Sequence, residues 1–233
     1  SLSLIEYLRR EPKSSSFPPG SNPTSLMRME DFARMIMVIS AVGEDPTNCG
    51  GVNYLVMLKS YYDGEQFGDP SSAEDDALAI LALRASGDIS PESEAMIAGA
   101  VDYIKSMQNT DGGWSYISGE SDPKVTSLII QALIAAGDNA DSDTIVEALD
   151  YLKRAQDERG GYSDAISTSY AIQALIVAGE DPSGWSWNGS ETPLDYLLSL
   201  QQEDGSFNNT IDMSFFPPRT TTFSILALCG KPY

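Results

Sequence analysis

A twelve-residue pattern recurs along this chain and limits its fold more than any other feature. Each copy starts at a tyrosine and places glutamine five residues later, glycine nine residues later and an aromatic residue eleven residues later. Complete copies occupy residues 103–114, 151–162 and 196–207, and weaker copies begin at Tyr7 and Tyr54. Successive tyrosines are thus 45 to 49 residues apart, a period typical of stacked structural repeats. The pattern predicts a single domain over residues 1–233, part of a longer protein, with five repeats at about 1–46, 47–90, 91–140, 141–184 and 185–233.

The second half of each repeat is predicted to be a helix that is apolar on almost every side. Residues 128–136 and 171–178 contain few polar side chains apart from Gln131 and Gln173. The first halves instead repeat apolar residues at helical spacing along one side only. An apolar helix must be covered by its neighbours, whereas an amphipathic helix can cover them from outside. The sequence therefore predicts an all-α fold, an α/α toroid of about five helical hairpins whose ring is closed or incomplete, with inner apolar and outer amphipathic helices.

The residues that recur in the pattern are predicted to be structural. Glycine permits a tight reversal of the chain, and a buried ring can fill the space between neighbouring hairpins. A glutamine amide can bond the main-chain groups left exposed at helix ends. These roles fit a turn between two antiparallel helices, and we assign them to Gln108, Gly112, Trp114, Gln156, Gly160, Tyr162, Gln201, Gly205 and Phe207.

Charge and residue content argue against several classes of function. The chain has 34 acidic and 14 basic residues and a net charge of -20, which disfavours binding to nucleic acid or anionic lipid. No apolar stretch approaches the roughly 20 residues that a membrane-spanning helix needs, so we expect no membrane insertion. Histidine is absent. That absence removes the commonest general base and the usual zinc ligand, and we predict neither a metal site nor a cofactor.

The two cysteines leave two alternatives open. Cys49 follows the second helix of repeat one and Cys229 ends that of repeat five, so they would be neighbours if the array closed into a ring. A disulfide between them would indicate an oxidising, extracellular setting. In the other alternative both residues are thiols. We expect an extracellular or cell-surface location.

The turns resemble a repeat that several known families share. Residues 108–114, Gln-Asn-Thr-Asp-Gly-Gly-Trp, are similar to the repeat of protein prenyltransferase β subunits, of squalene and oxidosqualene cyclases, and of cobalamin carriers such as intrinsic factor. This resemblance implies the α/α toroid and says less about activity. It also implies two catalytic signatures: zinc held by aspartate, cysteine and histidine in prenyltransferases, and protonation from Asp-x-Asp-Asp in triterpene cyclases. This chain has no histidine, and its nearest segment, Ala73-Glu74-Asp75-Asp76, lacks the first aspartate.

A ligand site is expected where the inner helices begin. In a closed toroid these helix starts and the aromatic residues near them would line the mouth of a central cavity. Such a mouth suits a bulky, mostly neutral small molecule, an isoprenoid or a corrinoid. Packing between neighbouring hairpins explains the same residues, so that alternative stays open. The candidates are Phe32, Asp76, Tyr116, Thr126, Thr168, Ser169, Tyr170, Phe215, Phe216 and Thr221.

Two functions follow from these observations. The first is a non-catalytic ligand-binding or protein-interaction module of a secreted or cell-surface protein. It would resemble the helical domain of cobalamin carriers, with cobalamin as the implied ligand and an additional domain as partner. The second is a small isoprenoid-handling enzyme or subunit, similar to terpene cyclases or prenyltransferases, in which Asp75 or Asp76 is the acid.

The carboxyl groups at positions 74–76 can be interpreted in both ways. Adjacent carboxyl groups raise one another's pKa and can supply a general acid. Carboxylates in the first turn of a helix also simply favour the helix dipole. The missing histidine and the incomplete aspartate motif make the non-catalytic module the preferred interpretation, with no catalytic residue.

Overall fold

The computed structural model describes residues 27–116, 119–187, 189, 191–210 and 217–231. These residues form nine helices and no strand, which confirms the predicted all-α class. Five helices make an inner layer: α2 (Met29–Ala41), α4 (Ala73–Ser86), α6 (Pro123–Ala136), α8 (Ala165–Val177) and α10 (Pro217–Leu228). The other four make an outer layer: α3 (Tyr54–Lys59), α5 (Pro91–Ser106), α7 (Asp143–Ala155) and α9 (Pro193–Ser199).

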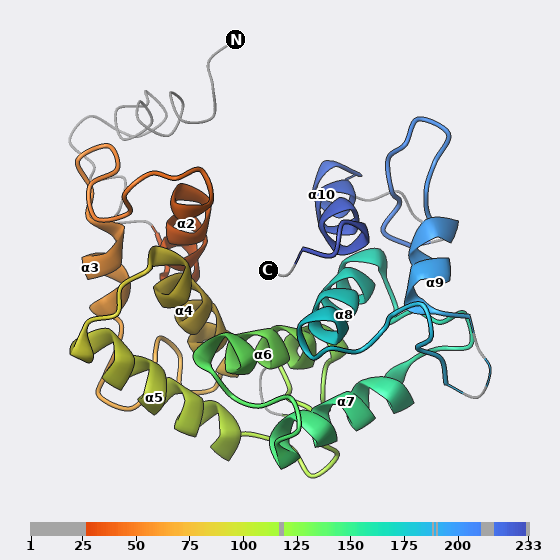
Figure 1. Cartoon of the computed structure of the whole chain (residues 1–233), viewed down its shortest axis with the longest axis horizontal. Coiled ribbons are helices and arrows are strands. Elements are labelled where there is room, and N and C mark those ends of the chain that lie inside the picture. The colour runs from red at the N-terminus through yellow and green to blue at the C-terminus, as the bar shows by residue number, and fades with distance from the viewer. Residues whose placement is uncertain (1–26, 117–118, 188, 190, 211–216, 232–233) are drawn as a thin grey trace.

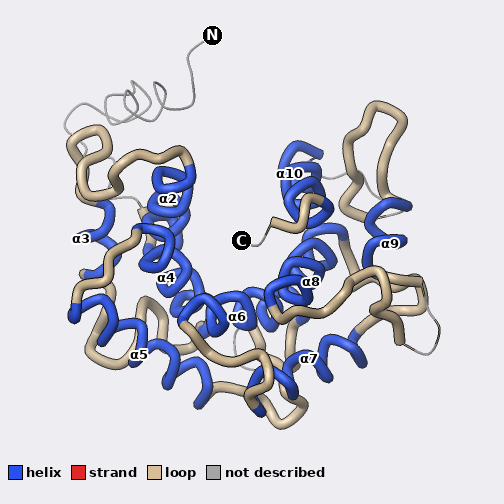
Figure 2. Tube along the Cα trace, viewed as in Figure 1, coloured by secondary structure: helices blue, strands red, loops and turns tan. Residues whose placement is uncertain are grey.

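The two layers form an arc that is open on one side (Figure 1). Inner helices pack against one another in the order α2, α4, α6, α8 and α10, and the outer helices cover their convex side (Figure 1). Loops make the connections between them (Figure 2). The α/α toroid is thus confirmed, and its described part is an incomplete ring that ends at α2 and α10. The first half of repeat one, within residues 1–26, lies outside the described residues.

Burial separates the layers as the apolar patterns predict. α6 buries nine consecutive residues, 125–133, because neighbouring helices cover it on several sides. Asp122 caps this helix by accepting a hydrogen bond from the Val125 N–H at 2.9 Å, and Gly137 ends it at a φ of 105°. The outer helix α7 buries residues on one face only, at intervals of three or four positions: Ile145, Ala148, Tyr151 and Leu152.

One hydrogen bond joins each of four turns to the inner helix that follows it. The N–H of the buried aromatic turn residue donates to a side-chain oxygen near the helix start. In three repeats the acceptor is a threonine hydroxyl: Trp114 to Thr126 at 3.0 Å, Tyr162 to Thr168 at 3.0 Å, and Phe207 to Thr221 at 2.9 Å. In repeat two the Phe67 N–H donates instead to Asp76 Oδ1 at 2.8 Å. Asp76 therefore occupies a threonine position of the repeat.

The glutamines of the pattern connect neighbouring repeats. The side-chain amide of Gln108 donates to Gly112 O in its own turn at 2.9 Å and to Thr144 O in α7 at 3.0 Å. Gln156 makes the equivalent pair of bonds, within its turn at 2.8 Å and to the loop before α9 at 3.3 Å. Gln201 differs because its side chain is exposed. Two of the three predicted glutamine contacts are thus present.

The tyrosines and glycines of the pattern also contribute to the contacts between neighbouring repeats. The hydroxyl groups donate to main-chain oxygens of the preceding repeat: Tyr103 to Pro70, Tyr151 to Ser121 and Tyr196 to Ser163. A positive φ favours glycine at Gly160, and a Cβ atom there would lie 2.1 Å from the Glu191 main-chain oxygen. Gly205 also has a positive φ, but no atom of the described residues lies within 4 Å of a Cβ placed there. The repeat therefore specifies how closely adjacent hairpins approach.

Candidate functional site

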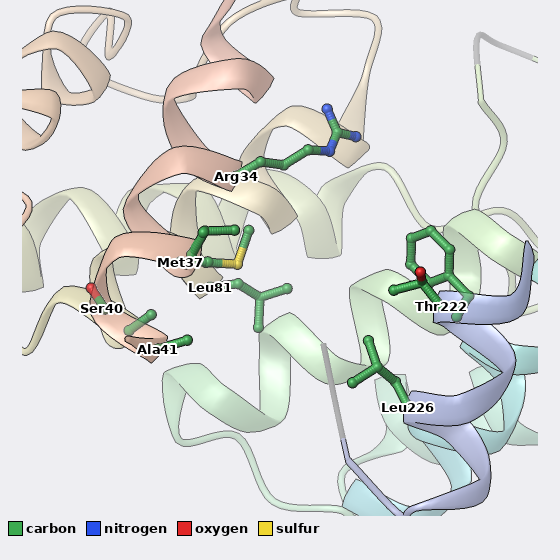
Figure 3. A pocket seen from close by; sticks show the side chains of 10 residues that line it. Arg34, Met37, Ser40, Ala41, Leu81, Thr222 and Leu226 are labelled. Carbon is green, nitrogen blue, oxygen red and sulfur yellow. The ribbon is translucent and has the colours of Figure 1, made fainter. Parts of the chain in front are cut away.

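An apolar cavity of about 580 Å³ lies between the two ends of the arc. We call it the inner cavity. Its residues come from α2, α4 and α10, and the labelled side chains of Met37, Leu81 and Leu226 point into the space between these helices (Figure 3). Most of the lining is apolar: Met37, Val38, Leu81, Ala85, Phe223 and Leu226.

A second pocket of about 600 Å³ adjoins the inner cavity where the inner helices begin. We call it the mouth pocket. Arg34 and Phe223 line both spaces, so an apolar interior leads directly to a polar entrance. The mouth pocket carries basic side chains from three inner helices and the residue before α2: Arg28, Arg34, Lys124 and Arg219. It also carries three carboxyl groups: Glu30, Glu74 and Asp75.

Asp75 is a carboxyl group of the mouth pocket whose acidity its surroundings change. It lies half-buried in the first turn of α4, where its Oδ2 accepts a hydrogen bond from the Asp69 N–H at 3.0 Å. Burial, with smaller contributions from the charges of Glu30 and Glu74, raises the pKa of Asp75 to about 6. A carboxyl group of this kind can be protonated near neutral pH, which a general acid requires.

Asp76 lies in a different environment, and the expectation that it borders the cavity mouth is corrected. Its side chain is fully buried, it lines neither the inner cavity nor the mouth pocket, and its Oδ1 accepts the Phe67 N–H. Its Oδ2 has no hydrogen-bond partner among the described residues. Burial raises the pKa of Asp76 to about 8. One step along a helix turns a side chain by about 100°, so neighbouring aspartates face different surroundings.

Most other predicted mouth residues prove to be packing residues. Phe32, Thr126, Thr168, Ser169 and Tyr170 are all buried. Thr221, which was also predicted to line the mouth, accepts a hydrogen bond from the Phe207 N–H in the turn. Tyr116 does line the mouth pocket, with 56% of its surface exposed. Phe215 and Phe216 lie outside the described residues.

Apart from Asp75 and Tyr116, the residues that line the inner cavity and the mouth pocket were not predicted. On α4, the face that carries them is turned by about 100° about the helix axis from the predicted Asp76. On α4 this face carries Asp75, Leu78, Leu81 and Ala85, which recur at intervals of three or four residues. No one-sided spacing in the sequence marks this face, because α4 is apolar on almost every side over residues 77–83. The structure also shows that the inner cavity is formed by α2, α4 and α10, whereas the predicted site included helix starts in α6 and α8.

The cysteines are thiols, with no disulfide between them. Cys49 is buried before α3, whereas Cys229 is exposed after α10, at the other end of the open arc (Figure 1). Of the two alternatives left open for the cysteines, the structure therefore has the two thiols. In the described part of the chain, every helix is too short or too polar to cross a membrane. The same residues contain no cluster of three or more acidic or cysteine side chains that could hold a metal ion.

Comparison with known proteins identifies the family of the chain. A family model described as the squalene-hopene cyclase C-terminal domain matches residues 60–223, well over half of the 233 residues. A drimenyl diphosphate synthase from Streptantibioticus cattleyicolor is 39% identical over an alignment of 88 residues that covers 35% of this chain. The chain spans only 16% of that protein's length.

These matches overturn one of the two predicted functions. The prediction of a non-catalytic module resembling the cobalamin carriers is wrong, because both matches are to isoprenoid-handling cyclases or synthases. The resemblance of the turn repeat to that of the squalene cyclases is confirmed. The chain belongs to the squalene-hopene cyclase family, in which it matches the C-terminal domain.

Proposed function

We propose that this chain is a terpene cyclase-like domain that binds an isoprenoid along the inner cavity and protonates it with Asp75. The observation that carries the proposal is the position of Asp75, a carboxyl group of raised pKa at the polar end of an apolar cavity. Membership of the cyclase family supports this chemistry. The apolar side chains of α2, α4 and α10 supply the surface that a hydrocarbon chain would cover.

The proposed reaction begins with proton transfer to a carbon–carbon double bond. The O–H bond of protonated Asp75 breaks, a C–H bond forms at one alkene carbon, and the other carbon becomes a carbocation. Attack by the electrons of a second double bond closes a ring and moves the positive charge. A water molecule then takes a proton from a carbon next to the cationic centre, so that a C–H bond breaks, a new double bond forms and the positive charge is discharged. The Asp75 carboxylate regains its proton from solvent. Tyr116 and Phe223 border the mouth pocket, where the faces of their rings could stabilise the cation.

Two turnover measurements test this proposal on the purified chain. The chain is incubated with squalene, farnesol or farnesyl diphosphate, and products are identified by gas chromatography and mass spectrometry. Asp75→Asn removes the transferable proton and should abolish turnover. Asp76→Thr is the matched control, because threonine occupies this position in three other repeats, and it should retain turnover.

The pH profile supplies an independent readout. Asp75 must be protonated to act as the acid, and its pKa is about 6. Turnover should therefore fall about tenfold for each pH unit well above 6, as the protonated fraction falls. Turnover by Asp75→Asn equal to that of the unmodified chain would contradict the assignment of the acid. Loss of turnover in Asp76→Thr alone would transfer that role to the buried aspartate.

A further inference from the structure

The turn between α3 and α4 approaches the Asp75 carboxyl group closely. Asp75 Oδ2 accepts a hydrogen bond from the Asp69 N–H at 3.0 Å. The residue before Asp69 is Gly68, whose φ of 72° lies in the left-handed region that favours glycine. A Cβ atom at Gly68 would lie 2.3 Å from Asp75 Oδ2 and 3.0 Å from its Cγ, well inside van der Waals contact. The carboxyl group therefore occupies space that any side chain at residue 68 would fill.

Hydrogen bonds on both sides of this contact fix the turn against α4. The Gly68 N–H donates to Tyr61 O at 3.1 Å. The N–H of the fully buried Phe67 donates to Asp76 Oδ1 at 2.8 Å. Asp75 and Asp76 thus bond the same turn from adjacent positions of α4. Because Asp76 anchors the turn, Gly68 has a defined position beside Asp75.

The contact determines which oxygen of Asp75 carries the proton. An oxygen that accepts an N–H bond uses a lone pair for it. In the protonated carboxyl group Oδ2 therefore acts as the acceptor, and the transferable proton lies on Oδ1. The bond also limits rotation of the carboxyl group, so its O–H has one orientation rather than several. A general acid requires this, because the proton must lie within reach of the atom that receives it.

We infer that Gly68 is a positioning residue for the proposed acid: its missing side chain lets the Asp69 N–H hold the Asp75 carboxyl group in the orientation that proton transfer requires. The inference rests on the proposed function, because the role it assigns belongs to the reaction that Asp75 would start. A methyl group at residue 68 would displace Oδ2. The carboxyl group would turn away, since a side chain yields more easily than a bonded turn, and it would lose the Asp69 N–H.

Loss of this hydrogen bond has a defined effect on the acidity of Asp75. Burial is the largest influence on the pKa of Asp75 and raises it to about 6, and the Asp69 N–H bond is the next and lowers it. The N–H stabilises the charged carboxylate, so its loss should raise the pKa by about one further unit. The other charged groups that line the spaces beside Asp75 are the same in every variant: Arg28, Glu30, Arg34, Asp69, Glu74, Lys124 and Arg219.

The first test is a titration of the Asp75 carboxyl group, followed by NMR of protein labelled with carbon-13 at the aspartate side-chain carboxyl carbons. Asp75→Asn identifies the signal. The midpoint should lie near pH 6 in the unmodified protein and about one unit higher in Gly68→Ala. Gly64→Ala is the matched control, because Gly64 lies in the same turn with a positive φ of 114°, but no atom of the described residues lies within 4 Å of a Cβ placed there. Its midpoint should equal that of the unmodified protein.

The second test measures turnover of squalene, farnesol and farnesyl diphosphate against pH. Gly68→Ala should lower the plateau rate at acid pH about tenfold or more, and the pH at which its rate falls should be about one unit higher. Gly64→Ala should keep both values. Gly68→Asn separates the contact from backbone strain, because asparagine tolerates a positive φ better than alanine but brings the same Cβ atom. It should behave like Gly68→Ala, with circular dichroism to check the fold of each variant.

Two results would overturn the inference. An Asp75 midpoint and a turnover rate in Gly68→Ala equal to those of the unmodified protein would show that the missing side chain does not place the carboxyl group. Equal effects in Gly64→Ala and Gly68→Ala would show that strain in the turn is the cause. In both cases, turnover that depends on Asp75 would still support the proposed function. An unmodified chain that turns over none of the three isoprenoids would overturn the proposed function, and the positioning role with it, whatever the titration shows.

Discussion

Replacing Asp76 by threonine should make the protein more stable at neutral and alkaline pH. Three other repeats place threonine at this position, where its hydroxyl accepts the aromatic N–H at 2.9 to 3.0 Å. The variant therefore keeps the hydrogen bond that Asp76 makes with Phe67. It removes a buried carboxyl group whose second oxygen has no partner among the described residues.

The magnitude follows from the pKa of Asp76, which burial raises from 3.8 to about 8. The folded state therefore holds the proton more tightly than the unfolded state. In the unmodified protein this contribution to stability is present below pH 4 and is lost as pH rises from 4 to 8. Between pH 5 and pH 8, the gap in unfolding free energy between Asp76→Thr and the unmodified protein should widen by roughly 3 to 4 kcal/mol.

The assay is urea unfolding followed by tryptophan fluorescence at pH 5, 6.5 and 8, with both proteins measured at each pH. Asp75 titrates in both proteins, so its contribution largely cancels in the comparison. Thr126→Asp is the reciprocal variant and should introduce a fall in stability over the same pH range. Parallel pH profiles for Asp76→Thr and the unmodified protein would refute the reasoning, because they would show that Asp76 has an ordinary pKa.

Two further predictions concern the repeat itself and the thiols. Gln156→Ala removes two hydrogen bonds to main-chain carbonyl groups and should lower the unfolding free energy by about 1 to 3 kcal/mol. Gln201→Ala is the control, because this side chain is exposed, and it should change the unfolding free energy by less than about 0.5 kcal/mol. Equal effects in urea unfolding would contradict the connecting role of the glutamine. In the folded protein Cys229 should react readily with a thiol reagent while buried Cys49 reacts only on unfolding. Two equally fast thiols would contradict the described burial.

Sequence reasoning predicted the repeat and the layers because both depend on local regularities. The turns at 108–114 and 156–162 have the positive-φ glycines, buried rings and bridging amides that their residue types indicate. The functional prediction was wrong because it weighed the missing histidine and the missing first aspartate too heavily. Neither is required for acid chemistry, since one carboxyl group with a raised pKa can protonate an alkene, and burial alone can raise it.

By itself, the sequence determined a two-layered helical array, because a period of 45 to 49 residues and the apolar inner segments permit few other arrangements. Only the tertiary structure decided which side of each inner helix faces the cavity and which helices form it. Asp75 and Asp76 are adjacent in sequence, yet one borders the mouth pocket and the other is buried beneath a turn. The rotation of a helix about its axis is set by packing against its neighbours. An apolar helix carries apolar residues on every side, so its sequence leaves that rotation undetermined.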